Sequence, residues 1–467
     1  MSEFFTKKSN EAVPVTPITP KKLKLWLEEQ DERTRAYVKA NRFKGAPQSV
    51  LQLFDKDGYP TRVLVGIDKA DKLYSYAQIS KDLPARAYFI DAPLNEHDAT
   101  QAAIGWALGQ YRFDAYFEKK NEKPNKLVMP PKADAKLVES TISAVTLVRD
   151  LVNTPANDLG PEELSKAAQT LAKEFNGKCK TDIVGEELLK KNYPLVHAVG
   201  KGSDRAPRLI DFSWGPKDAP KVTLVGKGVV FDTGGNNIKP GGSMGIMKKD
   251  MGGAAHVLGL ARMIMENDLN VQLRVLIPAV ENSINGRAMR PGDVYPSRKG
   301  LTVEIENTDA EGRLILADAL AEAAKDKPDL IIDFATLTGA ARVALGPDVP
   351  PLFTDNDDLA DEFEKAGQSL QDPLWQLPLL NDLYARMRGN NIADICHTGG
   401  GQGGAITAAL FLKKFIDDSK KWVHIDTWAW RAENRPGRPM GGDAIGMRAA
   451  YDVIKNRYGT APKKPKK

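Results

Sequence analysis

Two segments of the sequence hold most of the side chains that suit catalysis or metal binding. The first runs from Val225 to Asp250, reads VGKGVVFDTGGNNIKPGGSMGIMKKD, and contains Lys227, Asp232 and Lys239. Its glycines permit backbone conformations that bulkier residues rarely adopt, which lets the main chain approach a ligand closely. The segment also follows a predicted strand, and open α/β sheets place their sites at strand ends. A structural interpretation is equally open, because Asp250 would also serve as the N-cap of the helix that we expect next.

The second segment runs from Asn307 to Arg313, reads NTDAEGR, and follows the strand-like run TVEIE. Its two acids, Asp309 and Glu311, can reach the volume that the first segment faces. They also suit a helix start, Asp309 as the N-cap and Glu311 in the first turn, and such a cap stabilises a helix by about 0.5–2 kcal/mol. Taken by itself, the second segment is explained by helix capping.

Together the two segments place excess negative charge in one predicted site. The carboxylates and cations that they offer are Asp232, Asp250, Asp309, Glu311, Lys227, Lys239 and Arg313. Burying like charges close together is costly unless protons or cations neutralise them. Two divalent ions would balance the carboxylates charge for charge, and oxygen-rich ligation suits Mn²⁺, Mg²⁺ or Zn²⁺. The residues therefore predict a two-metal centre.

Other common catalytic motifs are absent from the sequence. The five histidines are scattered and form no HExxH pair, so a histidine-based zinc site is not expected. The sequence also lacks the GxxxxGK phosphate loop. This removes the usual support for a nucleotide hydrolase.

The elements that must position these residues fall into two predicted domains. In the first, Arg62 to Ile67 is typical of a strand and Ala99 to Tyr116 of a helix, which predicts a small α/β domain. A polar stretch rich in Lys and Pro, from Glu118 to Asp134, has the composition of an interdomain linker. The predicted parts are an N-terminal α/β domain at 1–125, a linker at 126–140, a catalytic domain at 141–460 and a basic disordered tail at 461–467.

In the catalytic domain, apolar runs alternate with helix-like stretches. The predicted strands are Val222–Val225, Gln272–Ala279, Leu330–Thr336 and Val423–Trp428, and the predicted helices are Gly252–Glu266, Arg313–Lys325 and Ala405–Asp417. Such alternation predicts an α/β fold in which a mixed central sheet is flanked by helices.

Composition predicts a soluble, cytoplasmic protein. A chain of 467 residues that is 42% hydrophobic can bury a large core. We expect no membrane span and no signal peptide, because no apolar run approaches the roughly 18–20 residues that a span needs. The two cysteines, Cys179 and Cys396, suit a reducing compartment. Lysines of the terminal APKKPKK supply most of the net charge of +5, so a nucleic-acid partner is not predicted.

At the two chemical segments, the sequence resembles the leucine aminopeptidase family, the cytosolic M17 metallopeptidases. The family signature NTDAEGR is complete from Asn307 to Arg313, and a second motif, Gly-Lys-Gly followed by Phe-Asp-Ser/Thr-Gly-Gly, Lys-Pro and Lys-x-Asp-Met, matches residues 226–251. The resemblance extends from about Leu147 to Gly459 and is fainter before Lys136. It implies a leucyl aminopeptidase-type metalloexopeptidase that releases leucine-like N-terminal residues from peptides through a metal-bridged water, and that assembles as a homohexamer.

The resemblance also implies two divalent metal ions, Mn²⁺ or Zn²⁺, in each subunit. Asp232 and Glu311 would bridge both ions. Lys227 and Asp250 would complete one site, and Asp309 would complete the other. Lys227 would have to bind as a neutral amine.

Further roles are implied around the metal ions. Lys239 and Arg313 would be the catalytic cations, with Lys239 donating to the tetrahedral oxyanion and Arg313 holding a bicarbonate ion that acts as the base. Five residues match positions that line the pocket for the first side chain of the substrate: Met247, Thr336, Gly339, Ala444 and Met447. Many relatives carry a small hydroxyl or apolar residue where this chain has Asn236 and Asn237.

Two alternatives to an aminopeptidase are open from the sequence. One is a two-metal phosphoesterase, because carboxylate-bridged cation pairs also serve phosphoryl transfer. The other is a DNA-binding or regulatory protein on an aminopeptidase scaffold, since some relatives bind DNA and the tail is basic. The complete set of ligands argues against a retired scaffold.

Overall fold

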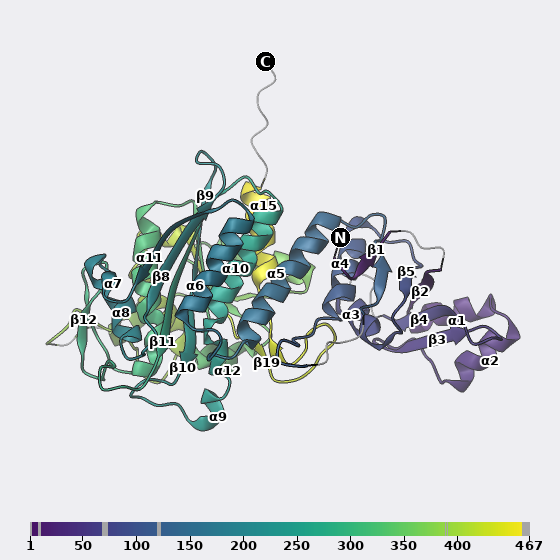
Figure 1. The fold of residues 1–467 in the computed structure, drawn as a ribbon, viewed down its shortest axis with the longest axis horizontal. Coiled ribbons are helices and arrows are strands. Elements are labelled where there is room, and N and C mark those ends of the chain that lie inside the picture. The colour runs from purple at the N-terminus through teal and green to yellow at the C-terminus, as the bar shows by residue number, and fades with distance from the viewer. Residues whose placement is uncertain are drawn as a thin grey trace, which may run out of the picture. The chain divides into compact units, whose positions relative to one another are not determined.

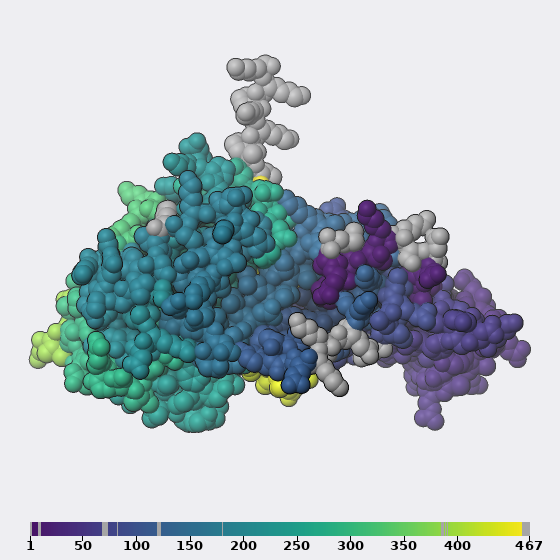
Figure 2. Space-filling view, in the orientation of Figure 1, coloured from purple at the N-terminus to yellow at the C-terminus, as the bar shows by residue number. Residues whose placement is uncertain are grey.

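A computed structural model of the chain shows two compact units. It describes residues 2–7, 11–67, 73–118, 123–387, 389 and 391–459. The first unit comprises Met1–Thr146 with Ala432–Met440, and the second comprises Leu147–Arg431 with Gly441–Lys467. Figures 1 and 2 colour most of the first unit purple to blue and the second from blue to yellow. The tail predicted at 461–467 lies outside the described residues.

The first unit is built on a six-stranded sheet of order β1-β6-β5-β2-β4-β3. Its strands are β1 (Phe5–Thr6), β2 (Val13–Ile18), β3 (Val50–Phe54), β4 (Pro60–Gly66), β5 (Ala87–Ile90) and β6 (Lys126–Val128), and its helices before α5 are α1 (Pro20–Glu28), α2 (Glu32–Ala40), α3 (Leu73–Asp82) and α4 (Glu96–Leu108). Helices α3 and α4 pack closely, because Gly105 has no side chain to meet the carbonyl oxygen of Leu73. The helix predicted at Ala99–Tyr116 therefore exists but ends earlier, at Leu108, where Gly109 is the C-cap.

The segment between the predicted domains contains regular structure. Residues 126–140 include β6 and the first turns of α5 (Ala135–Asn153). Strand β6 pairs with β5 and β1 of the first unit. The predicted domain bounds stay a prediction.

The second unit contains a nine-stranded mixed sheet, with β16-β15-β18-β14-β9-β11-β8-β7 in order and β10 paired to β11. Its strands are β7 (Lys178–Val184), β8 (Arg208–Trp214), β9 (Lys221–Gly226), β10 (Gly228–Asp232), β11 (Gln272–Asn282), β14 (Leu330–Ala335), β15 (Pro351–Phe353), β16 (Trp375–Gln376) and β18 (Trp422–Asp426). Strands β18, β14, β9, β11 and β10 run parallel to one another. Their carboxyl ends therefore meet at one edge of the sheet.

Helices cover both faces of this sheet (Figure 1). One layer contains α6 (Pro161–Glu174), α10 (Gly252–Glu266) and α15 (Met447–Tyr458), and the other contains α8 (Pro194–Gly200), α11 (Glu311–Lys325) and α14 (Gly404–Lys413). Alternate strand residues such as Val225, Leu276 and Ile331 join the core under the second layer. The predicted α/β architecture, a small N-terminal domain and a larger domain with a mixed, helix-flanked sheet, is confirmed.

The apolar side chains of the helices are buried in the core of the protein. Helix α10, for example, buries nearly all of its residues. Among the described residues, no helix has both the length and the apolar character needed to cross a membrane.

Candidate metal centre

The carboxyl ends of the parallel strands converge, which places the glycine-rich segment (Val225 to Asp250) beside the segment Asn307 to Arg313. Lys227 directly follows β9, Asp232 is the last residue of β10, and Thr336 directly follows β14. Asp250 lies in a 3₁₀ helix, η1 (Met247–Met251), and Glu311 is the first residue of α11. Residues distant in sequence thus meet beyond one edge of the sheet.

Lys227 lies at the centre of one half of the site. Its Nζ is 2.7 Å from Asp250 Oδ2 and 2.9 Å from Glu311 Oε1, and it donates a hydrogen bond to the carbonyl oxygen of Thr336 at 3.0 Å. A Cβ at Gly312 would lie 2.4 Å from Lys227 Cε, so glycine is required beside the lysine. The glycine of NTDAEGR is therefore needed for close packing.

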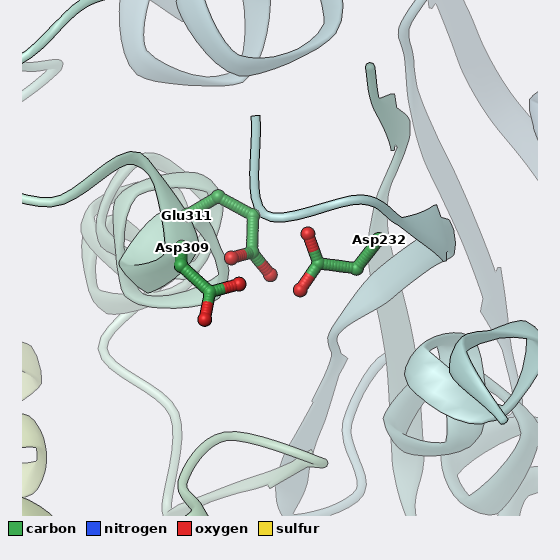
Figure 3. A group of neighbouring side chains, drawn as sticks. All are labelled: Asp232, Asp309 and Glu311. Carbon is green, nitrogen blue, oxygen red and sulfur yellow. The ribbon is translucent and has the colours of Figure 1, made fainter. Parts of the chain in front are cut away.

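Lys239 joins the other carboxylates. Its Nζ lies 2.9 Å from Asp232 Oδ2 and 2.5 Å from Asp309 Oδ1. Asp232, Asp309 and Glu311 each offer an oxygen, and these atoms lie within 4.8 Å of one another. Figure 3 shows the three carboxylates turned toward a common space, Asp232 from one side and the two acids of the α11 region from the other.

The N-cap interpretation of Asp250 and Asp309 is wrong, whereas Glu311 does lie in the first turn of α11. The N-cap of η2 (Thr308–Ala310) is Asn307, whose side chain accepts from the N–H of Asp309. Residues Ala310 and Met251 occupy the N-cap positions of α11 and α10, and neither makes a side-chain capping bond. The carboxylates are therefore free of helix capping and point into the centre.

Neighbouring polar groups orient individual ligand atoms. The hydroxyl of Thr336 donates to Asp250 Oδ1 at 2.8 Å. The amide of Asn282, at the end of β11, donates to Asp232 Oδ1 at 2.7 Å, and the N–H of Gly234 donates to the same oxygen at 2.9 Å. Sequence reasoning missed Asn282, because the predicted strand ended at Ala279 whereas β11 continues to Asn282.

The pair Asn236 and Asn237 has a structural role. Asn237 Oδ1 accepts from the N–H of Thr308 at 2.9 Å, and the Thr308 hydroxyl accepts from the N–H of Asn237 at 2.8 Å. Asn236 donates to the carbonyl oxygen of Met289 at 2.8 Å. These bonds join the loop that carries Lys239 to the loop that carries Asp309.

Burial of so many charges shifts their proton affinities. Burial, together with the neighbouring Asp232, raises the pKa of Glu311 to about 8. Burial and Asp250 raise the pKa of Asp232 to about 6. For Lys227, burial favours the neutral amine, but the surrounding carboxylates outweigh it and raise the pKa. Without a metal, protons therefore compensate the excess negative charge.

The donor set fits divalent cations. Three buried carboxylate oxygens, Asp250 Oδ2, Asp309 Oδ1 and Glu311 Oε1, accept no well-formed hydrogen bond from the described residues. Buried carboxylate oxygens are normally hydrogen-bonded, so atoms of this kind are suited to a metal. Lys227 and Lys239 stand where their ammonium groups neutralise the same oxygens.

Arg313 lies on α11, two residues beyond Glu311, and does not pair with the carboxylates in the described part of the chain. It is buried, and Nη1 donates to the carbonyl oxygen of His397 at 2.9 Å, whereas Nε finds no acceptor among the described residues. Burial lowers the pKa of Arg313 to about 10, which still leaves the guanidinium charged at neutral pH.

The five residues predicted to line the substrate pocket lie on elements next to the acids. Thr336 contacts Asp250 directly, and Met247 shares η1 with Asp250. Gly339 begins α12 (Gly339–Leu345), Met447 begins α15, and Ala444 lies just before it. Their shared role as a pocket stays a prediction.

The chain is similar to known proteins along most of its length. Residues 146–451 match the model of the cytosol aminopeptidase family catalytic domain, and residues 13–130 match that of the M17 aminopeptidase N-terminal domain. A probable cytosol aminopeptidase of Aquifex aeolicus is 41% identical over 364 residues, which cover 76% of this chain and 73% of that protein.

Solved structures give the same result. The cytosol aminopeptidase of Coxiella burnetii has a TM-score of 0.93 and 45% identity, covering 98% of this chain and 99% of its own. The bottromycin maturation enzyme BotP in complex with Mn has a TM-score of 0.86 and 30% identity, covering 96% and 99%. With family matches over both units and this resemblance along nearly the whole chain, the protein belongs to the cytosol aminopeptidase family, M17, and is an aminopeptidase of the hydrolase class.

Proposed function

We propose that the chain releases leucine-like N-terminal residues from peptides at a centre that holds two divalent metal ions. The observation that carries this proposal is the convergence of four carboxylates, those of Asp232, Asp250, Asp309 and Glu311, on only two lysines. This leaves excess negative charge that two divalent cations would balance. The Mn complex of the similar enzyme BotP supports Mn²⁺ as one occupant, and Zn²⁺ is the other ion that we propose.

The residues that would hold the ions follow from the two halves of the site. Lys227, as a neutral amine, and Asp250 would serve one ion, and Asp309 the other. Asp232 and Glu311, which lie between the two lysines, would serve both. When bound, a pair of divalent ions lowers the pKa of a water molecule and polarises a carbonyl group.

Two further cations would act on the reacting groups. Lys239 remains charged, because its carboxylate neighbours outweigh its burial and raise its pKa, and it would donate to the oxyanion that forms during peptide hydrolysis. Arg313, with an unsatisfied Nε, would hold a bicarbonate ion that accepts the proton of the attacking water. Removing bicarbonate should then lower kcat, and Arg313→Ala should abolish that dependence.

Substrate selection would begin at the free α-amine. The metal-loaded centre would hold that amine, which confines cleavage to the first peptide bond. The predicted pocket residues Met247 and Met447 are buried and apolar, which suits leucine- or methionine-like side chains.

The decisive experiment is hydrolysis of leucine p-nitroanilide by the full chain after chelation and after addition of Mn²⁺, Zn²⁺ or Mg²⁺. We expect activity to disappear on chelation and to return with Mn²⁺ or Zn²⁺. N-acetyl-leucine p-nitroanilide should resist cleavage, and a phosphate ester tests the phosphoesterase alternative. Metal-loaded protein that cleaves the acetylated or phosphate substrate, but not leucine p-nitroanilide, would refute the proposal.

Assembly and location are also proposals. We infer a cytoplasmic homohexamer, supported by the family resemblance and by exposed apolar side chains such as Ile238, Ile284 and Val343. Light scattering coupled to size-exclusion chromatography measures the assembly, and a monomer at micromolar concentration would contradict it.

A further inference from the structure

Lys249 is a buried cation next to the proposed metal ligand Asp250. The residue is only 2% exposed. Within the described part of the chain, its ammonium group makes neither an ion pair nor a hydrogen bond, and it lies over the Trp428 ring, 3.9 Å from the centroid. Burying a charge without a counter-ion is costly. A cation–π contact at a desolvated site offsets about 2 kcal/mol of that cost.

The neighbouring lysine differs from Lys249 in having a hydrogen-bond acceptor. Lys248 precedes it in the same 3₁₀ helix, and its Nζ donates to the carbonyl oxygen of Asn153 at 2.6 Å. Lys248 also lies over a ring, 5.8 Å from the Trp430 centroid, but it has a hydrogen-bond acceptor as well. Lys249 has only the closer aromatic face and forms no ion pair with the described residues.

Lys249 and Trp428 lie among the elements predicted to receive the first side chain of the substrate. Lys249 is two residues from Met247 in η1. Ala429, the residue after Trp428, lies close to Thr336. The side chains of both residues pack against Gly252, where a Cβ would collide with each of them.

A second cation approaches the same ring. The guanidinium of Arg342 lies 4.4 Å from the Trp428 centroid. Arg342 is on α12, three residues after Gly339, and lines a small pocket together with Trp428 and Thr338. The Trp428 ring thus contacts two cations, Lys249 and Arg342. Both cations lie on elements that also carry predicted pocket residues.

We propose that Lys249 is a specificity-determining residue that favours acidic first side chains, Asp or Glu, over basic ones, Lys or Arg. The inference rests on the proposed aminopeptidase function and on the predicted position of the pocket. An ammonium group in a low-dielectric wall attracts a substrate carboxylate and repels a substrate cation. Discrimination of this kind acts on charged side chains and leaves the apolar preference in place.

The test is a comparison of kcat/KM for the p-nitroanilides of leucine, glutamate and lysine, using the full-length, Mn²⁺-loaded protein. For the wild type, we expect leucine to be best and glutamate to exceed lysine by at least about tenfold. In Lys249→Met, the ratio of glutamate to lysine should fall about tenfold or more while bound Mn²⁺, measured by elemental analysis, stays the same. Lys249→Arg should keep most of the ratio, and Lys248→Met is the matched control that should leave it unchanged.

Each outcome decides between the proposals. Wild type that cleaves leucine p-nitroanilide but prefers lysine to glutamate overturns this inference alone, as does a Lys249→Met protein with an unaltered ratio. Wild type that cleaves none of the amides with metal bound overturns the proposed function itself. If Lys249→Met fails to fold, Lys249→Gln replaces it, and the wild-type ratio already tests the sign of the preference.

Discussion

Two glutamates of helix α11 belong to ionic clusters that differ in burial and in the hydrogen bonds that their carboxylates accept. Glu322 accepts from Arg274 at 2.9 Å and also from Arg298, and Arg274 further binds Asp211 at 2.6 Å. Glu311 instead pairs with Lys227 at 2.9 Å, and among the described residues its Oε1 accepts no other hydrogen bond. The two residues share a helix and a side-chain type, so the difference comes from their surroundings.

The proton affinities of the two glutamates diverge accordingly. Burial disfavours the charge of Glu322, but hydrogen bonds and the charges of Arg274 and Arg298 prevail and lower its pKa. At Glu311, burial and nearby carboxylates raise the pKa to about 8. A satisfied cluster stabilises the fold, whereas a cluster with excess charge and unsatisfied oxygens is prepared for an added cation.

The largest effect is expected for Glu311→Gln. Activity on leucine p-nitroanilide should fall by about 10³-fold or more, because a proposed bridging ligand is lost. In metal-free protein at pH 7, Gln resembles the protonated acid, so urea unfolding should change little. Added Mn²⁺ should raise the Tm of the wild type but not that of the variant. A variant that still gains thermal stability with Mn²⁺ would remove Glu311 from the metal ligands.

Lys239→Ala should separate oxyanion stabilisation from metal binding. We expect kcat to fall by about 10²- to 10³-fold, since a hydrogen-bond donor to the oxyanion is lost. Bound metal, measured by elemental analysis, should survive. Lys299→Ala, which removes a surface ion pair with Asp417, is the control. Loss of the metal ions from the Lys239 variant would contradict the assignment.

Glu322→Gln tests the satisfied cluster with the same chemical change. The free energy of unfolding should fall by about 1.5–3 kcal/mol, because charge-assisted hydrogen bonds to Arg274 and Arg298 are weakened. The activity of the folded variant per molecule should remain close to that of the wild type. Unfolding curves in urea, read beside those of Glu311→Gln, provide the measurement. Equal losses of stability in Glu322→Gln and Glu311→Gln would contradict the proposed difference between the two clusters.

The smallest predicted effect is a pH dependence at His397, which lies behind Arg313. Burial, followed by the charge of Arg313, lowers the pKa of His397 to about 3, so the folded state keeps the ring neutral. Because the folded pKa is below the unfolded value, this stability is present above about pH 6.5 and is lost as pH falls toward 3. The loss should reach up to about 1.4 kcal/mol for each pH unit below 6.

Urea unfolding of metal-free protein at pH 7.5, 6 and 5 measures this dependence. The difference in stability between the wild type and His397→Gln should narrow as pH falls. His97→Gln, at an exposed histidine, is the matched control. A difference that is constant with pH would show that His397 titrates alike in the folded and unfolded states.

Much of the site was visible in the sequence. The glycine-rich segment and NTDAEGR supplied every acid that the structure brings together, and the predicted helix Gly252–Glu266 has the observed bounds. These features are local, since periodicity and loop composition act over a few residues. The sequence could not separate two roles for the same residue. Asp250 and Asp309 each stand just before a predicted helix and could be its N-cap, but neither is the N-cap of that helix.

What the sequence by itself determined is the set of chemical groups and the α/β alternation of elements that carries them. Tertiary structure alone decided that Lys227 pairs with Asp250 and Glu311 while Lys239 pairs with Asp232. It also decided which oxygens stay unsatisfied. These outcomes depend on the order and direction of strands distant along the chain, and that order is fixed by the packing of helices on both faces of the sheet, which residue spacing does not encode.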